Sequence, residues 1–280
     1  MKKLLFSLMI SWLLVFALSF SAPADVLYTV SDLENSSKLG LINKDSSGNL
    51  TDNIILSGLS VSSAVFSFKH NGQDRVLLIE GQDDIGTNKI SVYDPADFSK
   101  VLATGTISTK LMSVYTAAEF GNNLILAGDG VNTDKGAIVE INPDTCAVVN
   151  QFEFGSVNAK NTISNGQNDN FARLAVNNGK IYATFGRNVN GTYTFFTVEA
   201  DSVSNLSEAY AKSSSFPVTY NIRSLNNNLY LGVHSDKPGL YKVNSLSSIE
   251  KFISDETLDF DTDGSSGFYY TTWSGGYARY

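Results

Sequence analysis

The sequence predicts an all-β fold, a β-propeller built of four-stranded antiparallel blades. Short runs rich in Val, Ile and aromatic residues alternate with turns rich in Gly, Asn, Asp and Pro, which is the pattern of strands and hairpins. These runs form groups that recur about every 50 residues, a period typical of propeller repeats. No long stretch keeps apolar residues at helical spacing. A pair of β-sandwiches or a β-solenoid is the alternative fold.

The stretch from Met112 to Phe154 contains one complete repeat. A single four-stranded meander cannot bury both of its faces, whereas meanders arranged radially pack on one another and leave only short edges. Its strands are expected at Val114–Phe120, Leu124–Gly128, Ala137–Ile141 and Ala147–Phe154, with turns at Gly121-Asn122-Asn123, 129–136 and Asn142-Pro143-Asp144.

The other groups follow the same pattern along the chain. The first is expected to have three strands, Val26–Val30, Leu39–Ile42 and Ile54–Leu56, and the second four, Ala64–Phe68, Val76–Glu80, Ile90–Tyr93 and Val101–Leu102. The fourth comprises Phe171–Val176, Lys180–Phe185, Tyr193–Val198 and a weak run near Leu206–Tyr210. The fifth comprises Tyr220–Leu225, Leu229–Val233, Leu240–Val243 and Ile249–Ile253, and the sixth Leu258–Phe260, Phe268–Trp273 and Tyr277–Tyr280.

This grouping predicts about five to six blades. Both ends of the chain offer a second strand, so the two end groups do not complement each other as ring closure requires. Three arrangements remain open: six blades with two incomplete, five blades with a redundant strand, or a chain truncated at its C-terminal end.

The N-terminal segment predicts export. Lys2 and Lys3 precede the apolar run 4–20, and Ala22-Pro23-Ala24 provides a small-residue cleavage site, so residues 1–24 are expected to be a secretory signal peptide. The remaining residues 25–280 are expected to form a single propeller domain without a membrane span, located in the periplasm or outside a bacterial cell. A retained N-terminal membrane anchor is the alternative.

Composition narrows the classes of partner. The chain has 28 acidic against 20 basic residues and a formal net charge of −8, which argues against nucleic acid or anionic lipid as a partner. Cys146 is the one cysteine, so no internal disulfide can form, and a packed, unreactive thiol is expected.

Three segments carry a resemblance to a known group of proteins: KISVYDPADFSKVL (89–102), GAIVEINPDTCAVV (136–149) and GLYKVNSLSSIEKF (239–252). Each resembles the third strand, turn and fourth strand of bacterial YVTN-type and quinoprotein-dehydrogenase-like propellers. The resemblance covers most of the chain after residue 24 at the level of the repeat, and it implies a propeller of that superfamily without implying an activity. The tryptophan-rich repeats of true quinoproteins are missing, because the tryptophans are Trp12 and Trp273.

Alternating carboxylates in the last group suggest a weak Ca²⁺ site. Asp259, Asp261 and Asp263 precede Gly264, and carboxylates at alternate positions before a glycine can converge on a hard cation. The glutamate that closes an EF-hand loop is missing, since Tyr270 occupies its position. The alternative is an ordinary hairpin between the first and second strands of the group.

Two further sets of residues are candidates for ligand binding. Arg173 and Arg223 fall on first strands, which line the channel of a propeller, where they could bind an anion or cross-link neighbouring blades. The longer polar loops between second and third strands lie on one face, where a rigid scaffold usually carries its binding residues. Their candidate residues are Asp83, Asp84, Asp129, Asp134, Arg187 and His234.

Catalysis has little support in the sequence. His70 and His234 are the two histidines, neither has metal-ligand spacing, and no nucleophile elbow or phosphate-binding loop is present. We therefore expect a monomeric binding or interaction module for a protein or carbohydrate ligand, with no cofactor other than Ca²⁺. The alternatives are a carbohydrate-active hydrolase or lyase, which needs only two suitably placed carboxylates, and a truncated propeller without independent activity.

Overall fold

The computed structural model describes residues 15–17, 26–32, 36–44, 47, 49–60, 64–81, 88–107, 111–130, 135–154, 169–189, 192–210, 214–216, 219–233, 237–262, 268–272 and 277–279. These residues form antiparallel sheets whose strands follow one another in sequence order. The first three sheets contain β1 (Val15–Ala17), β2 (Val26–Asp32), β3 (Ser36–Lys44) and β4 (Leu50–Leu59); β5 (Ala64–His70), β6 (Gln73–Glu80), β7 (Asn88–Asp94) and β8 (Asp97–Ile107); and β9 (Leu111–Phe120), β10 (Asn123–Gly130), β11 (Gly136–Ile141) and β12 (Val148–Glu153).

The second half of the chain continues the pattern. Its sheets contain β13 (Asp169–Asn177), β14 (Lys180–Val189), β15 (Thr192–Ala200) and β16 (Ser214–Phe216); β17 (Thr219–Leu225), β18 (Asn228–Val233), β19 (Gly239–Ser245) and β20 (Ser248–Ile253); and β21 (Asp259–Thr262), β22 (Phe268–Thr271) and β23 (Tyr277–Arg279). A 3₁₀ turn, η1 (Val203–Asn205), and a short helix, α1 (Leu206–Tyr210), lie between β15 and β16.

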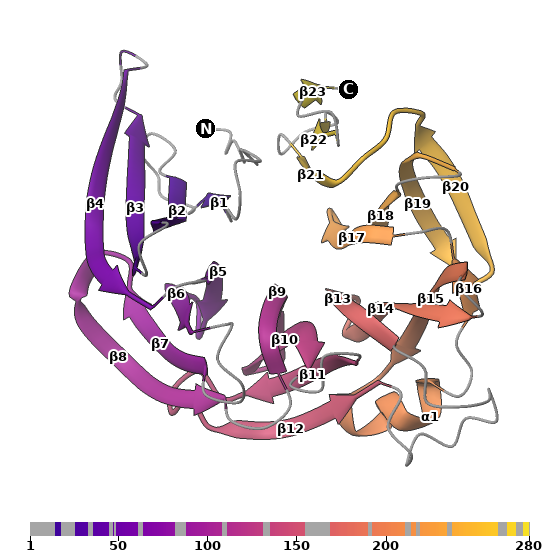
Figure 1. The fold of residues 1–280 in the computed structure, drawn as a ribbon, viewed down its shortest axis with the longest axis horizontal. Helices are drawn as coiled ribbons and strands as arrows, with labels where there is room; N and C mark the ends of the chain where they lie inside the picture. The colour runs from indigo at the N-terminus through magenta and orange to yellow at the C-terminus, as the bar shows by residue number, and fades with distance from the viewer. Residues whose placement is uncertain are drawn as a thin grey trace.

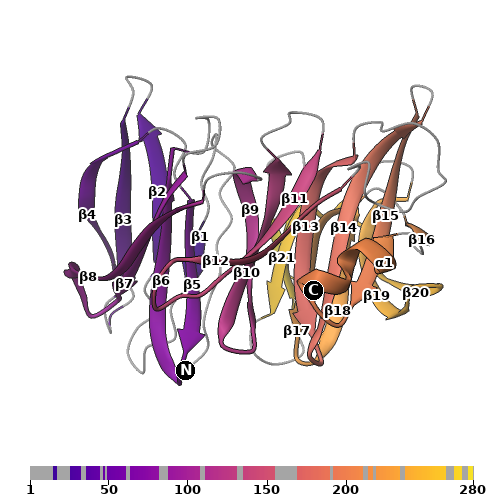
Figure 2. The same ribbon diagram turned by 90° about the horizontal axis from the view of Figure 1, so that it is seen from below.

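The sheets are arranged radially around a central axis (Figure 1). The first strand of each sheet lies nearest the axis, and the side view shows these strands running along it (Figure 2). This arrangement confirms the prediction of an all-β propeller. Among the described strands, no pairing joins the first sheet to the last.

The hydrophobic core consists of layers between successive sheets. A cluster of buried apolar side chains lies between each sheet and the next. Strand β10 shows how alternation builds two such layers: Leu124 and Leu126 pack toward the second sheet, while Ile125 and Ala127 pack toward the fourth. Because full burial of such a side chain is worth about 1.5–3 kcal/mol, these layers contribute most of the energy that holds neighbouring sheets together.

The hairpins between first and second strands adopt the turns that the sequence predicts. Asn71, Asn178, Asn226 and Asn227 have positive φ angles of 51°, 50°, 51° and 60°. Asparagine and glycine tolerate this left-handed conformation best, and it suits the twist of a tight hairpin. The third hairpin uses Gly121, with φ 59°, in the same role.

The expected strand near Leu206–Tyr210 is wrong, because this segment forms helix α1. The preceding turn η1 is capped by Ser202, whose hydroxyl accepts a hydrogen bond of 3.2 Å from the Asn205 N–H. Val203 and Leu206 are buried in the core layer between the third and fourth sheets. The short β16 then completes the fourth sheet in place of the expected strand.

Strand β1 lies within the predicted signal peptide and pairs with β2 from Val15 to Ala17. Cleavage after Ala24 remains a prediction. A cleaved chain would begin its first sheet with β2, which agrees with the three strands that the sequence predicts for that group. No helix of the described ranges is long and apolar enough to span a membrane.

The thiol of Cys146 is buried and free in this fold. Burial is the main reason that its pKa rises to about 11, which keeps the thiol protonated and unreactive. Its backbone has a φ of 56°, and the residue packs closely on Gly105 of β8. The cysteine is therefore a packing residue, as the sequence predicted.

Candidate binding site

The first strands of neighbouring sheets enclose a cavity of ≈ 370 Å³ on the central axis. Its polar lining comes from Tyr115 on β9, Arg173 on β13, Asn221 and Arg223 on β17, and Asp259 on β21. A second cavity of ≈ 330 Å³ shares residues of β5, β9, β13 and β17 with the first, so the two are parts of one channel. Each volume falls at the lower end of the range for small-molecule sites.

Arg223 and Asp259 form an ion pair between the fifth and sixth sheets. The Arg223 Nη2 lies 2.9 Å from Asp259 Oδ1 and 3.1 Å from Oδ2, and Nε lies 3.1 Å from Oδ1. The Asn221 amide also donates to Oδ1. Desolvation alone would lower the pKa of Arg223, but Asp259 and nearby Asp261 outweigh it and raise the pKa. Arg223 therefore cross-links two sheets while facing the cavity.

Arg173 makes the corresponding contact between the third and fourth sheets. Its guanidinium carbon lies 3.8 Å from the centre of the Tyr115 ring, which is the geometry of a cation–π interaction. The Tyr115 hydroxyl donates a hydrogen bond to Asp129 Oδ2. Burial and the Asp129 carboxylate together raise the pKa of Tyr115. The tyrosine thus stays protonated and links Arg173 to a carboxylate of β10.

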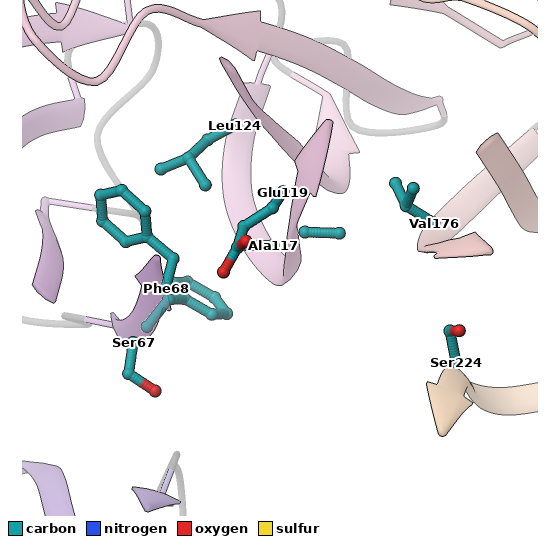
Figure 3. Close-up of a pocket in the computed structure, with 9 residues that line it drawn as sticks. Ser67, Phe68, Ala117, Glu119, Leu124, Val176 and Ser224 are labelled. Atoms are coloured by element: carbon teal, nitrogen blue, oxygen red, sulfur yellow. The ribbon is translucent and has the colours of Figure 1, made fainter. Parts of the chain in front are cut away.

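The channel also has an apolar side, formed by residues of β5 and β9. Phe66 of β5 and the small residues Ala117 and Ala118 of β9 line both cavities. Figure 3 shows Val176 and Ser224 lying across the open space from this side. Toward the turns, Glu119 accepts a hydrogen bond from the Lys69 N–H, so its carboxylate also bridges two sheets.

The structure brings together several of the predicted site residues. Arg173, Arg223 and Asp259 line one cavity, and Asp129 lies directly behind Tyr115. Arg187 lies on β14, but its side chain is outside the described part of the structure. The remaining candidates, Asp83, Asp84, Asp134, His234 and Asp263, lie outside the described residues.

The calcium prediction remains untested for the same reason. Among the described residues, no three His, Cys, Asp or Glu side chains are grouped as metal ligands. Asp259 and Asp261 both lie close to the Arg223 guanidinium. That positive charge opposes a cation at these two carboxylates.

Sequence reasoning missed Tyr115 and Asn221. The position of Asn221 in its repeat could have identified it. The separation between Asn221 and the turn residue Asn226 equals the separation between Arg173 and the turn residue Asn178. Equivalent positions on the first strands of successive blades share one depth in the channel. Tyr115 offers no such signal, because a lone tyrosine on a strand is usually a core residue.

The chain matches no protein-family model and no curated protein. Solved structures show the likeness of its fold. It resembles the Dos1 propeller with a TM-score of 0.52 and 12% identity, covering 92% of this chain and 65% of that one. It also resembles an ancestral GH74 enzyme, with a TM-score of 0.52 and 13% identity, covering 95% of this chain and 40% of that one.

A third structure, an exo-1,5-α-L-arabinanase from a bovine ruminal metagenomic library, matches 95% of both chains with a TM-score of 0.43 and 9% identity. The match to the Dos1 propeller supports the propeller fold. The chain spans about two thirds of the Dos1 propeller and less than half of the GH74 enzyme. Identities this low connect the protein to a fold and to no particular activity.

Proposed function

We propose that this protein is an exported binding module that takes a small polar organic ligand into its central channel. The observation that carries the proposal is the cavity of ≈ 370 Å³ that Arg173, Asn221, Arg223 and Asp259 line together with apolar residues of β5 and β9. A concave site with a few convergent polar groups on an otherwise apolar lining is the usual form of a ligand pocket. The rigid sheets hold these groups in place before the ligand arrives.

Binding fits the channel better than glycoside hydrolysis. Hydrolysis needs two carboxyl groups across the scissile bond, one of them able to donate a proton. Of the described carboxylates in the channel lining, Asp259 already accepts hydrogen bonds from Arg223 and Asn221, and Glu119 accepts one from the backbone of Lys69. Both carboxylates therefore already accept hydrogen bonds that connect neighbouring sheets.

In this proposal the protein is a monomer of five to six four-stranded blades, related to the YVTN and quinoprotein-dehydrogenase-like propellers. The predicted signal peptide supports a location in the periplasm or outside a bacterial cell. The acidic composition suits a soluble exported protein and disfavours nucleic acid as the ligand.

The proposal is tested with purified protein and a panel of sugars, organic acids, amines and amino acids. Thermal shift identifies candidates, and calorimetric titration then measures their affinity. An Arg173→Gln variant should weaken binding of a true channel ligand by about tenfold or more, since a charged hydrogen bond is lost. Arg75→Gln serves as the matched control, because Arg75 lies on β6 and hydrogen-bonds the Asp74 carbonyl at 2.8 Å.

Two results would overturn the proposal. One is a panel without any ligand whose binding depends on Arg173. The other is release of reducing sugar from an oligosaccharide at a rate that depends on the channel carboxylates, which would favour the hydrolase instead.

A further inference from the structure

We propose that the channel ligand is a zwitterion, a free α-amino acid with an apolar side chain. This inference rests on the proposed function and names the class of ligand for the same site. Its carboxylate would accept hydrogen bonds from Arg223, its ammonium group would donate to Asp259, and its side chain would lie against the apolar side of the channel.

The Arg223–Asp259 pair has hydrogen-bonding capacity that its own contacts do not use. Arg223 uses Nε and Nη2 on Asp259, and within the described part of the chain Nη1 has no hydrogen-bond partner. Asp259 Oδ1 accepts from Arg223, Asn221 and the Phe260 N–H, whereas Oδ2 accepts only from Arg223 Nη2 within the same part. A terminal guanidinium nitrogen carries two N–H donors and a carboxylate oxygen two lone pairs. The pair therefore still offers a donor and an acceptor.

Both groups are accessible from the cavity. The side chains of Arg223 and Asp259 are 22% and 26% exposed, and both residues line the cavity of ≈ 370 Å³. Arg173 lines the same cavity from the neighbouring strand β13 and adds a second positive charge beside the proposed carboxylate position.

The balance of charge decides between classes of ligand. A simple anion would be attracted to Arg223 but repelled by the neighbouring Asp259 carboxylate. A simple cation would be attracted to Asp259 but repelled by Arg223. A zwitterion places one charge on each partner and leaves neither opposed. The Arg173 guanidinium covers one face of Tyr115, so that face is not open for stacking on a sugar ring.

The apolar side of the channel accounts for the side chain. Phe66, Ala117 and Ala118 line both cavities, so the apolar surface continues from the first cavity into the second. The small alanine side chains leave space that an aliphatic group could fill. Removing such a group from water would add affinity in proportion to its area.

The experiment compares four ligands that each keep or lose one feature. L-Leucine carries both charges and the side chain, glycine lacks the side chain, N-acetyl-L-leucine lacks the ammonium group, and L-leucinamide lacks the carboxylate. Calorimetric titration of the whole protein should show leucine binding at least about tenfold more tightly than each of the others. Arg75→Gln protein serves as the control and should keep the leucine affinity of the unmodified protein.

The outcomes separate the inference from the proposed function. If leucinamide or N-acetyl-leucine binds as tightly as leucine, the zwitterion inference is wrong while a channel ligand stands. The inference is equally wrong if no amino acid binds although another small molecule does so in an Arg173-dependent way. If the channel has no ligand at all, both fail. The comparison uses different ligands on the unmodified protein. It therefore does not depend on whether a protein with a substitution at Asp259 folds.

Discussion

Replacing Asp259 with alanine should weaken the contact between the fifth and sixth sheets. The change removes the carboxylate that accepts three guanidinium hydrogen bonds from Arg223 and one amide hydrogen bond from Asn221. It also leaves Arg223 without its counter-charge in a site where the arginine side chain is only 22% exposed. The ion pair adds to the apolar layer in which Phe260, Phe268 and Tyr270 of the sixth sheet pack on the fifth.

The expected magnitude follows from distance and burial. Opposite charges 2.9 Å apart attract by roughly 6 kcal/mol at an effective dielectric constant of about 20. Desolvation of both groups cancels much of this attraction, and breaking a fully buried pair costs about 3–5 kcal/mol. Since both side chains are about one quarter exposed, we expect Asp259→Ala to lower the free energy of unfolding by about 2–3 kcal/mol.

Equilibrium urea unfolding, followed by fluorescence and circular dichroism, measures this loss. Arg223→Met should cost a similar amount, and the double variant about as much as either single one, which corresponds to a coupling energy of about 2 kcal/mol. The raised pKa of Arg223 keeps it charged in the folded state, and its stabilising effect would be lost only as pH rises through that raised value. The loss should therefore be the same at pH 6 and pH 9.

A second ion pair provides the matched control. Lys69 Nζ lies 2.9 Å from Asp74 Oδ1, the same distance, but the lysine side chain is 54% exposed. Asp74→Ala should therefore cost less than about 1 kcal/mol. If Asp259→Ala costs no more than Asp74→Ala, or if the two substitutions at the cross-link are additive, the pair does not hold the sheets together.

Four further predictions concern stability and chemistry. Gly105→Ala should destabilise the protein by about 1–3 kcal/mol, because the new Cβ would lie 2.8 Å from both Cβ and the carbonyl oxygen of Cys146; Cys146→Gly should restore part of the loss in urea unfolding. The Cys146 thiol, with its pKa raised to about 11, should react with a disulfide reagent at pH 8 only after unfolding, and rapid reaction of the folded protein would contradict its burial. Burial and a carboxylate acceptor raise the pKa of Tyr28 and Tyr270 to about 12, against about 10 when unfolded. The folded state holds these protons more tightly, so stability should fall as pH rises from about 10 to about 12, and a phenylalanine at either position should reduce that fall in melting temperature. Calorimetric titration with Ca²⁺ tests the predicted aspartate site, and no heat together with an unchanged melting temperature would rule it out.

The repeat and its turns could be predicted from the sequence because they depend on neighbouring residues. The Asn178-Gly179 pair forms a tight hairpin through its own backbone preferences, and both residues have positive φ in the structure. Alternation along Leu124–Ala127 assigns each side chain to one face of a sheet, whichever sheet lies opposite. Local rules of this kind determined the all-β class, and the repeat of about 50 residues predicted the radial arrangement.

Local pattern was less reliable where another part of the chain decides the outcome. The sequence of Leu206–Tyr210 is compatible with a weak strand as well as with a helix. Burial of Val203 and Leu206 between two sheets favours the helix there. A single apolar side chain carries no information about the shape of the surface that it will meet.

The candidate site depends almost entirely on tertiary structure. In the sequence, Asp259 belongs to an incomplete calcium-binding motif, and Arg223 is a charged residue on a predicted strand. The fold brings these residues, 36 positions apart, into one ion pair at the channel and places Arg173 on the ring of Tyr115 from the neighbouring sheet. The sequence by itself determined which residues lie on first strands. Which of these residues face one another was decided only by the radial packing of the sheets. The core layers between the sheets set how far apart the first strands lie, and the sequence of a single strand does not contain that distance.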